Sequence, residues 1–202
     1  MATEQKQRKT IIAFAGRNCC GKGTAAEHAA SMLNAPKHTY SDVLYEIHGV
    51  CGIPRPAVPR SNLQDLSTFV RDWFGQDCLA RVMAKKCEAA AASYVVIDGV
   101  RRLDDIVILQ AEYGDALILV WIEASADNRY ARAKLRKEKA GEEFKTREAF
   151  DEEEKAESEI QLDLVRQACR TVIDNDGPPE ALAPQVEALI GAVADFGPVA
   201  HG

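Results

Sequence analysis

"TIIAFAGRNCCGKGT", residues 10–24, joins an apolar run to a loop that contains three glycines and one lysine. Residues 10–15 have the length and the near-continuous apolar character of a strand buried on both faces of a sheet. Four residues separate Gly16 from Gly21 and Lys22 follows, which is the G-x-x-x-x-G-K spacing of a phosphate-binding loop. Glycines allow backbone N–H groups to converge on phosphate oxygens, and the following helix and the lysine add positive charge. The stretch therefore predicts a site for nucleotide phosphates, with an unoccupied tight turn as the alternative.

The rest of the chain alternates between strand-like and helix-like segments. Strands are expected at 10–16, 94–99, 116–123 and 170–174, with a weaker candidate at 36–40. Helices are expected at 24–33, 61–75, 78–92, 103–112, 126–138 and 147–168, and a last one within 179–195. Pro184 makes that last helix either kink or start late. Strands separated by helices predict right-handed crossovers and a parallel sheet covered on both faces, but they do not predict the strand order.

Several helix ends carry recognisable signals. Ser61 and Gln64 have the spacing of a capping box, and Gly75 is expected to end that helix. Its apolar residues share one face, which we expect to be buried: Leu63, Leu66, Phe69, Val70 and Trp73. Ser125 and Thr146 are expected to cap the helices that follow them.

Composition narrows the class of protein. The chain has 202 residues, 47% of them apolar, which suits one globular domain. Acidic residues outnumber basic ones by 31 to 25, giving a net charge of −6, so no nucleic acid polymer is expected as a partner. No apolar window reaches the length of a membrane span, and the polar start lacks the apolar region of a signal peptide. We therefore expect a cytoplasmic protein with no membrane partner.

Six cysteines are scattered along the chain without a CxxC pair: Cys19, Cys20, Cys51, Cys78, Cys87 and Cys169. A chain of this size needs no disulfide staples, so we expect reduced thiols and no zinc site. Cys19 and Cys20 lie in the loop itself. Thiols at a helix N-terminus can have a depressed pKa, so a redox role is the alternative to their being small loop residues.

A second segment, "YVVIDGVRR" at 94–102, supports the nucleotide site that the glycine loop predicts. Asp98 ends a buried strand at the sheet edge where the phosphate loop is expected, which suits a ligand of nucleotide-bound Mg²⁺. The alternatives are a helix N-cap for Asp98 and a solvated surface position for Arg102. Position 23 is glycine and Thr24 is then the hydroxyl nearest the metal, an arrangement that, with the "DGVRR" segment, resembles adenylate kinase and other nucleoside monophosphate kinases.

The resemblance implies a three-layer α/β/α P-loop NTPase fold with a five-stranded parallel sheet. It implies a single domain with a core at 10–44, 94–128 and 165–195, a helical acceptor-binding region at 45–92 and a lid at 129–160. The pattern is similar to a branch of P-loop kinases between adenylate kinases and dephospho-coenzyme A kinases. ATP and Mg²⁺ are the implied cofactors.

The resemblance also assigns roles to residues. Cofactor binding falls to Gly16, Arg17, Asn18, Cys19, Cys20, Gly21, Lys22, Gly23, Thr24, Asn175 and Gly177. Thr24 and Asp98 would hold the metal, and the catalytic set is Lys22, Asp98, Arg129, Arg132 and Arg136. The loop that contains Asn175 and Gly177 would lie against the donor base, and Gly177 is expected at a positive φ.

The lid arginines come from the most charge-dense part of the chain, residues 123–154. Arg129, Arg132 and Arg136 recur at helical spacing and share one face. The resemblance puts Arg129 near the donor and Arg132 or Arg136 at the transition state. The alternative is an ordinary solvated helix.

On the acceptor side the implied residues are Asp42, Arg71 and Arg102. Tyr45 stands where the family has an acceptor-binding arginine, so Arg60 or Arg71 would have to supply that charge.

These residues together predict transfer of the ATP γ-phosphoryl group to a small phosphorylated acceptor, a nucleoside monophosphate above all. Two alternatives stay open: transfer to a hydroxyl in the manner of dephospho-coenzyme A kinase, with Asp42 as the base, and a nucleotide-binding switch with slow hydrolysis. The expected assembly is a monomer or a small homo-oligomer.

Overall fold

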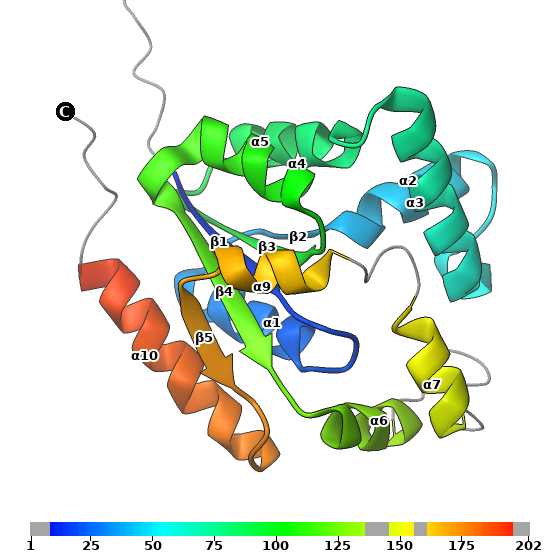
Figure 1. Cartoon of the computed structure of the whole chain (residues 1–202). Coiled ribbons are helices and arrows are strands. Elements are labelled where there is room, and N and C mark those ends of the chain that lie inside the picture. Colours follow the sequence, from blue (N-terminus) through cyan, green and yellow to red (C-terminus); the bar gives the residue numbers. More distant parts are fainter. Residues whose placement is uncertain (1–8, 136–145, 156–160, 196–202) are drawn as a thin grey trace, which may run out of the picture.

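The computed structural model describes residues 9–135, 146–155 and 161–195. Its centre is a five-stranded parallel sheet in the order β2-β3-β1-β4-β5 (Figure 1). The strands are β1 (Thr10–Ala15), β2 (Lys37–Thr39), β3 (Tyr94–Val100), β4 (Leu117–Glu123) and β5 (Thr171–Asp174). All five expected strands are present, and the weakest candidate forms the short edge strand β2.

Helices fill the connections between the strands. The α-helices are α1 (Lys22–Leu33), α2 (Tyr40–Val50), α3 (Arg60–Phe74), α4 (Cys78–Ala89), α5 (Leu103–Tyr113), α6 (Ala126–Leu135), α7 (Arg147–Glu153), α9 (Leu162–Ala168) and α10 (Leu182–Asp195). Short 3₁₀ turns are η1 (Arg55–Ala57), η2 (Gly114–Ala116) and η4 (Pro179–Ala181). Among the described residues, no helix is long and apolar enough to cross a membrane.

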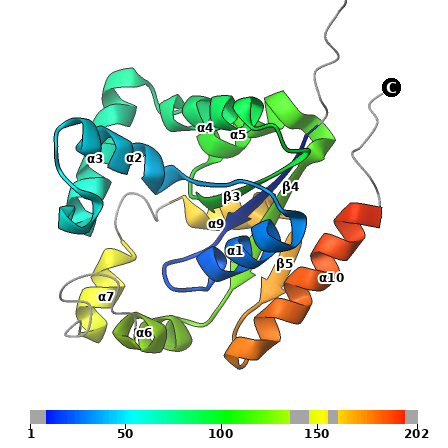
Figure 2. The ribbon, with the colours of Figure 1, turned by 180° about the vertical axis from the view of Figure 1, so that it is seen from behind.

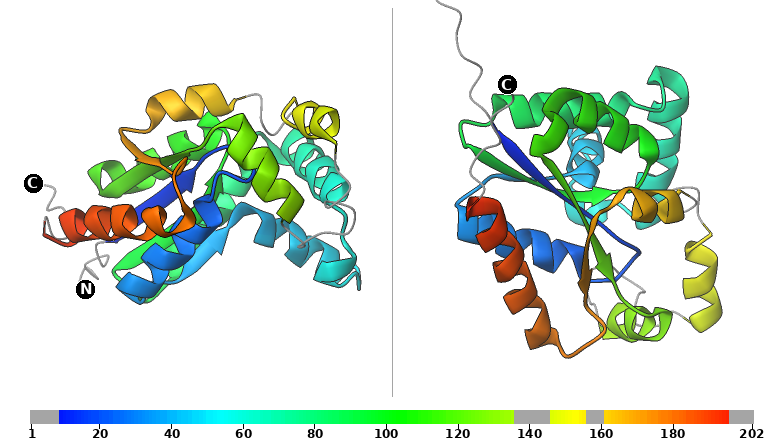
Figure 3. Two further views of the ribbon diagram at one scale, coloured as in Figure 1. Left: turned by 90° about the horizontal axis from the view of Figure 1, so that it is seen from below. Right: turned by 60° about the vertical axis from the view of Figure 1, so that its left-hand side comes forward.

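The two faces of the sheet are covered by different helices (Figures 2 and 3). Ile12 and Phe14 of β1 pack with α1 and α10, whereas Ile11 and Ala13 pack with α2 to α5 and α9. Alternate strand residues point to opposite faces, so a continuous apolar run such as β1 serves both cores. The predicted three-layer α/β/α class is confirmed.

The helix-end predictions have mixed outcomes. Gly75 ends α3, and Thr146 caps α7. The capping box predicted at Ser61 is wrong, because α3 already begins at Arg60 after Pro59 and has no side-chain cap. Pro59 takes the N-cap position in an extended conformation, so Ser61 lies inside the first turn of α3.

Two further expectations are corrected. The single helix expected over 147–168 is divided, since α7 ends at Glu153 and α9 begins at Leu162. The apolar face of α3 is only partly buried: Leu63 and Val70 lie in the core, but Phe69 is 57% and Trp73 is 74% exposed. Their rings stack on each other, with centroids 6.0 Å apart. α10 starts late, so Pro184 falls in its first turn, where it breaks no helical hydrogen bond.

The strand order positions the functional site. β1 lies at the centre of the sheet, between β3 and β4, and its carboxyl end leads into the glycine loop and α1. Crevices form at the carboxyl edge of such a sheet where neighbouring strands connect in opposite directions. The sequence expectation of a site at this edge is consistent with the fold.

Candidate functional site

The glycine loop has the tight backbone that its sequence requires. Gly16 has φ 151°, and a Cβ there would lie 2.7 Å from the Ile122 carbonyl oxygen. Gly21 has φ 97° and precedes α1, and a Cβ there would overlap the Asn175 side chain. Cys19 also adopts a left-handed conformation, with φ 59°. Right- and left-handed residues in succession curl the backbone into a concavity of N–H groups that suits an anion.

Lys22 begins α1, and its Nζ lies 3.3 Å from the Arg17 carbonyl oxygen, across the loop. The Arg17 side chain leaves the loop, since its Nη2 binds Asp163 of α9 at 2.6 Å. Burial raises the pKa of the Cys20 thiol, with Lys22 opposing that shift. The six cysteines are all free thiols. A redox role for Cys20 is therefore disfavoured, because a raised pKa reduces the thiolate that such chemistry needs.

Asp98 lies beside the loop. It is in β3, level with Phe14 on β1 and with Thr39 on β2. A Cβ on Gly23 would lie 3.3 Å from Oδ2 of Asp98, so this carboxylate faces the start of α1. Its other oxygen, Oδ1, is buried and has no hydrogen-bond partner among the residues that the structure describes. Asp98 does not cap a helix, since the residue that precedes α5 is Arg102.

Asp98 and Thr24 fit a site for a Mg²⁺ ion bound to a nucleotide. A buried carboxylate oxygen without a partner is costly unless a cation, a water or a ligand satisfies it. Thr24 is exposed in the first turn of α1, after Gly23. No cluster of three or more His, Cys, Asp and Glu occurs in the described part of the chain, so the protein alone offers few metal ligands. Mg²⁺ commonly takes one or two protein oxygens and completes its shell with phosphate and water, which matches this arrangement.

The loop after β5 lies against the glycine loop. Asn175 is buried, and its Nδ2 donates to the Cys20 carbonyl at 2.8 Å. Asp176 accepts hydrogen bonds from the Ser125 backbone N–H at 2.7 Å and from Asn128, which lower the pKa of its carboxyl group. Gly177 lies in the exposed turn, but the prediction of a positive φ for it is wrong, since it is not among the glycines with that conformation.

Two of the arginines predicted for the lid contact the glycine loop, where they donate to its backbone carbonyls. Arg129 is 4% exposed and donates from Nη1 to the Asn18 carbonyl at 3.4 Å and from Nε to the Ala124 carbonyl at 3.1 Å. Both of its Nη atoms bind the carboxylate of Glu154, at the end of α7. Arg132 donates to the carbonyls of Cys20 and Asn175. The third predicted lid residue, Arg136, is outside the described residues.

Asp42 is the first of the three residues predicted to bind the acceptor. It forms a capping box with Thr39 at the start of α2, and its Oδ1 binds Arg55 at 2.8 Å. The Arg55 guanidinium also lies 4.2 Å from the ring centroid of Tyr45. Because Thr39 pairs with Asp98 in the sheet, this cluster lies on the same carboxyl edge as the loop. Arg55 is 60% exposed and was not singled out in the sequence, where it lies in a proline-rich connection.

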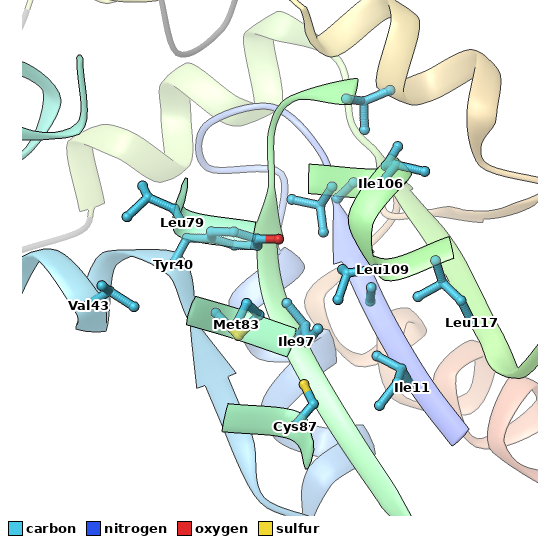
Figure 4. Packing of buried hydrophobic residues seen from close by; sticks show 14 of the residues in the cluster. Ile11, Tyr40, Val43, Leu79, Met83, Cys87, Ile97, Ile106, Leu109 and Leu117 are labelled. Atoms are coloured by element: carbon cyan, nitrogen blue, oxygen red, sulfur yellow. The ribbon is translucent and has the colours of Figure 1, made fainter. Parts of the chain in front are cut away.

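The other two predicted acceptor residues are buried. Arg71 and Asp105 form an ion pair at 2.9 Å with 4% and 1% of their side chains exposed. Arg102 is 4% exposed and donates to the side chain of Gln76 at 3.2 Å. Burial raises the pKa of Asp105, an effect that Arg71 opposes. Tyr40 packs nearby, against Leu79 and Met83 (Figure 4), and burial raises its pKa well above the usual value.

The sequence analysis did not predict which residues bind these arginines. Asp105, Gln76 and Glu154 each bind a predicted arginine from a distant part of the chain. Asp105 reads as an ordinary first-turn acidic residue of α5, and Glu154 reads as one of several solvated glutamates. No local pattern distinguishes a glutamate that meets a buried guanidinium from its neighbours.

No protein-family model matches the sequence. The sequence is similar to a UPF0200/UPF0201 protein of Archaeoglobus fulgidus, with 25% identity over 182 residues that cover 89% of this chain and 54% of the relative. It is also similar to a UPF0200 protein of Methanosarcina acetivorans, with 31% identity over 127 residues that cover 62% of this chain and 65% of the relative. The chain spans less than two thirds of the length of these curated relatives.

Solved structures with the same architecture include several kinases. A shikimate kinase of Acinetobacter baumannii in complex with shikimate matches with a TM-score of 0.57 and 13% identity, over 95% of this chain and 96% of the other. A shikimate kinase of Bacteroides thetaiotaomicron matches with a TM-score of 0.60 and 14% identity, over 92% and 98%. A gluconokinase of Sinorhizobium meliloti matches with a TM-score of 0.54 and 14% identity, over 95% and 96%. The resemblance to adenylate kinases stays a prediction. At these sequence identities the structural likeness establishes the architecture alone: the chain has the fold of the P-loop kinases.

Proposed function

We propose that this protein is an ATP-dependent phosphotransferase that moves the γ-phosphoryl group to a small-molecule acceptor. The observation that carries the proposal is the meeting of two features from separate strands. The glycine loop after β1 offers curled backbone amides and Lys22, and β3 brings the partnerless oxygen of Asp98 to the same point. Phosphoryl transfer needs positioning and charge neutralisation rather than a covalent nucleophile, and these groups supply both.

Each group has a defined task in this proposal. The loop amides and the Lys22 ammonium bind the β and γ phosphates and hold the γ-phosphorus in line with the acceptor. Thr24 and Asp98 would hold Mg²⁺, which when bound would offset the negative charge of the phosphates. The chain's own contribution is therefore a rigid, positively charged cradle with one carboxylate opposite it.

Two classes of acceptor are proposed. A nucleoside monophosphate follows from the sequence resemblance, and the exposed Arg55 beside Asp42 is a cation that can receive its phosphate. A hydroxyl acceptor without a phosphate is favoured by the occupation of Arg71 by Asp105, which removes one predicted phosphate ligand. The structural neighbours include a shikimate kinase and a gluconokinase, and they support the second class by analogy of fold alone.

A coupled assay of ADP release tests the proposal. The panel contains nucleoside monophosphates, shikimate, gluconate, simple sugars and dephospho-coenzyme A, each with ATP and Mg²⁺. Lys22→Ala is expected to reduce acceptor-stimulated turnover at least about 10²-fold, the scale for loss of one charge-stabilising donor. Lys85→Ala, an exposed lysine on α4, is the matched control and should leave turnover unchanged.

Acceptor-independent slow hydrolysis across the whole panel would contradict transfer and favour a nucleotide-dependent switch. Turnover that Lys22→Ala leaves intact would remove the loop from the mechanism. Stimulation by one class of acceptor alone would choose between the phosphorylated and the hydroxyl candidates.

A further inference from the structure

The outer side of the glycine loop is held by donors from two distant segments. The Cys20 carbonyl accepts from Asn175 Nδ2 at 2.8 Å and from Arg132 Nη1 at 3.4 Å. The Asn18 carbonyl accepts from Arg129 Nη1 at 3.4 Å. Every one of these bonds is made to the loop's backbone, so the three side chains contact the loop without depending on its side-chain identities.

The direction of a carbonyl fixes the direction of the next amide. In a trans peptide the C=O of one residue and the N–H of the following residue point in opposite directions. Holding the Cys20 oxygen on the outer side therefore turns the Gly21 N–H toward the inside of the loop. Holding the Asn18 oxygen does the same for the N–H of Cys19. These are the groups that would face a bound phosphate.

Asn175 is well placed to act as the rigid member of this set. It is 5% exposed, and its own backbone N–H binds the Glu123 carbonyl at 2.9 Å. Its carbonyl oxygen accepts from Arg132 Nη2 at 2.6 Å. Arg132 thus bridges Asn175 and the loop with two arms of one guanidinium, a geometry that the planar fork of arginine favours. The space beside Gly21 is filled by the Asn175 amide, which leaves no room for a side chain there.

We propose that Asn175 and Arg132 are positioning residues that fix the loop from its outer side, with Arg129 in a supporting place. They orient the amides of the phosphate cradle before any ligand arrives and do not themselves bind the donor base. The inference rests on the proposed function, because it concerns the same phosphate site. It differs from the roles expected from the family resemblance, which put the arginines against the transferring phosphate and the loop of Asn175 against the base.

The test measures ligand binding by calorimetry, with ATP and with inorganic tripolyphosphate, each with Mg²⁺. Tripolyphosphate has the phosphates without a base, so it separates the cradle from base contacts. The variants are Asn175→Asp, which keeps the shape but loses the donor, Arg132→Met, and Arg132→Lys, which keeps the charge but loses the fork. Arg132 is only partly buried, so its variants are expected to fold even if Asn175→Asp does not.

Asn175→Asp and Arg132→Met are each expected to weaken binding about tenfold, or by about 1.4 kcal/mol. The factor should be the same for ATP and for tripolyphosphate. Arg132→Lys should recover only part of that loss. Hydrogen exchange of the ligand-free protein should become faster across residues 16–24 in the same variants. The KM for the acceptor should stay at the wild-type value.

Three controls separate positioning from general damage. Asn62→Asp, at an exposed place on α3, and Arg166→Met, on α9 where the arginine side chain is 39% exposed, make the same chemical changes away from the loop and should bind both ligands normally. Val186→Ala removes buried volume from α10 in the cluster beneath the loop, and it should lower thermal stability without changing affinity.

Two results would overturn the inference while leaving the proposed function intact. One is wild-type affinity in Arg132→Met and Asn175→Asp for ligands that the wild-type protein binds. The other is a loss confined to ATP with tripolyphosphate unaffected, which would mean contact with the base. A wild-type protein that binds neither ligand would instead overturn the proposed function.

Discussion

Removing Asp105 should test how strongly α3 is tied to α5. Its ion pair with Arg71 joins α5 to α3, and only 1% and 4% of the two side chains are exposed. In Asp105→Ala the guanidinium of Arg71 stays buried and loses its anionic partner. An uncompensated buried charge is the costliest outcome of a point substitution, because neither water nor protein satisfies it.

The expected loss of unfolding free energy follows from the degree of burial of the ion pair. Breaking a buried pair from one side costs about 3–5 kcal/mol of unfolding free energy. For a chain of this size that loss lowers the melting temperature by roughly 6–20 °C. The Arg71 bond to the Gln76 carbonyl remains in the variant and reduces the cost toward the lower end. Arg71→Met combined with Asp105→Leu removes both charges together, and should be less destabilised than Asp105→Ala alone.

Urea unfolding followed by circular dichroism measures these differences. The control is Asp127→Ala, which breaks an ion pair with Arg147 in which the aspartate is 86% exposed. That variant should lose no more than about 1 kcal/mol. If Asp105→Ala also stayed within about 1 kcal/mol of the wild type, the burial argument for the Arg71 pair would be refuted.

The remaining predictions concern the loop, the thiols and the exposed face of α3. Gly21→Ala should destabilise the protein by more than about 1 kcal/mol and weaken ATP binding, since φ 97° and the Asn175 side chain both oppose a Cβ; normal binding in calorimetry would contradict this. Cys20 should be alkylated at least about tenfold more slowly than the exposed Cys51 at pH 8, because a raised pKa leaves less thiolate at that pH. Equal rates for the two thiols by mass spectrometry would argue against the burial of Cys20. Trp73→Gln should change the unfolding free energy by less than about 0.5 kcal/mol, and a larger loss would mean that Trp73 is packed in solution.

Much of the architecture follows from short-range patterns. The run 10–15 is apolar at every position after Thr10, and only a strand with a core on each face can bury all six residues. The spacing of Gly16, Gly21 and Lys22 is a local property of the backbone, so the loop between β1 and α1 was predictable without knowing what surrounds it. Asp98 was predictable for the same reason, because the end of one parallel strand lies at the edge where the others end.

The state of the charged side chains depends on contacts between residues far apart in the chain. Arg71 and Arg55 have the same side chain, yet one is buried with Asp105 and the other lies exposed over Tyr45. The energy of a charge depends on its depth and on its neighbours, and neither quantity is written in the local sequence. Folding brings Arg132 and Asn175, which are 43 positions apart, to the same loop carbonyl. The local sequence thus predicts where a phosphate would be held, while the packed layers determine which arginines stay exposed to a ligand and which hold the protein together.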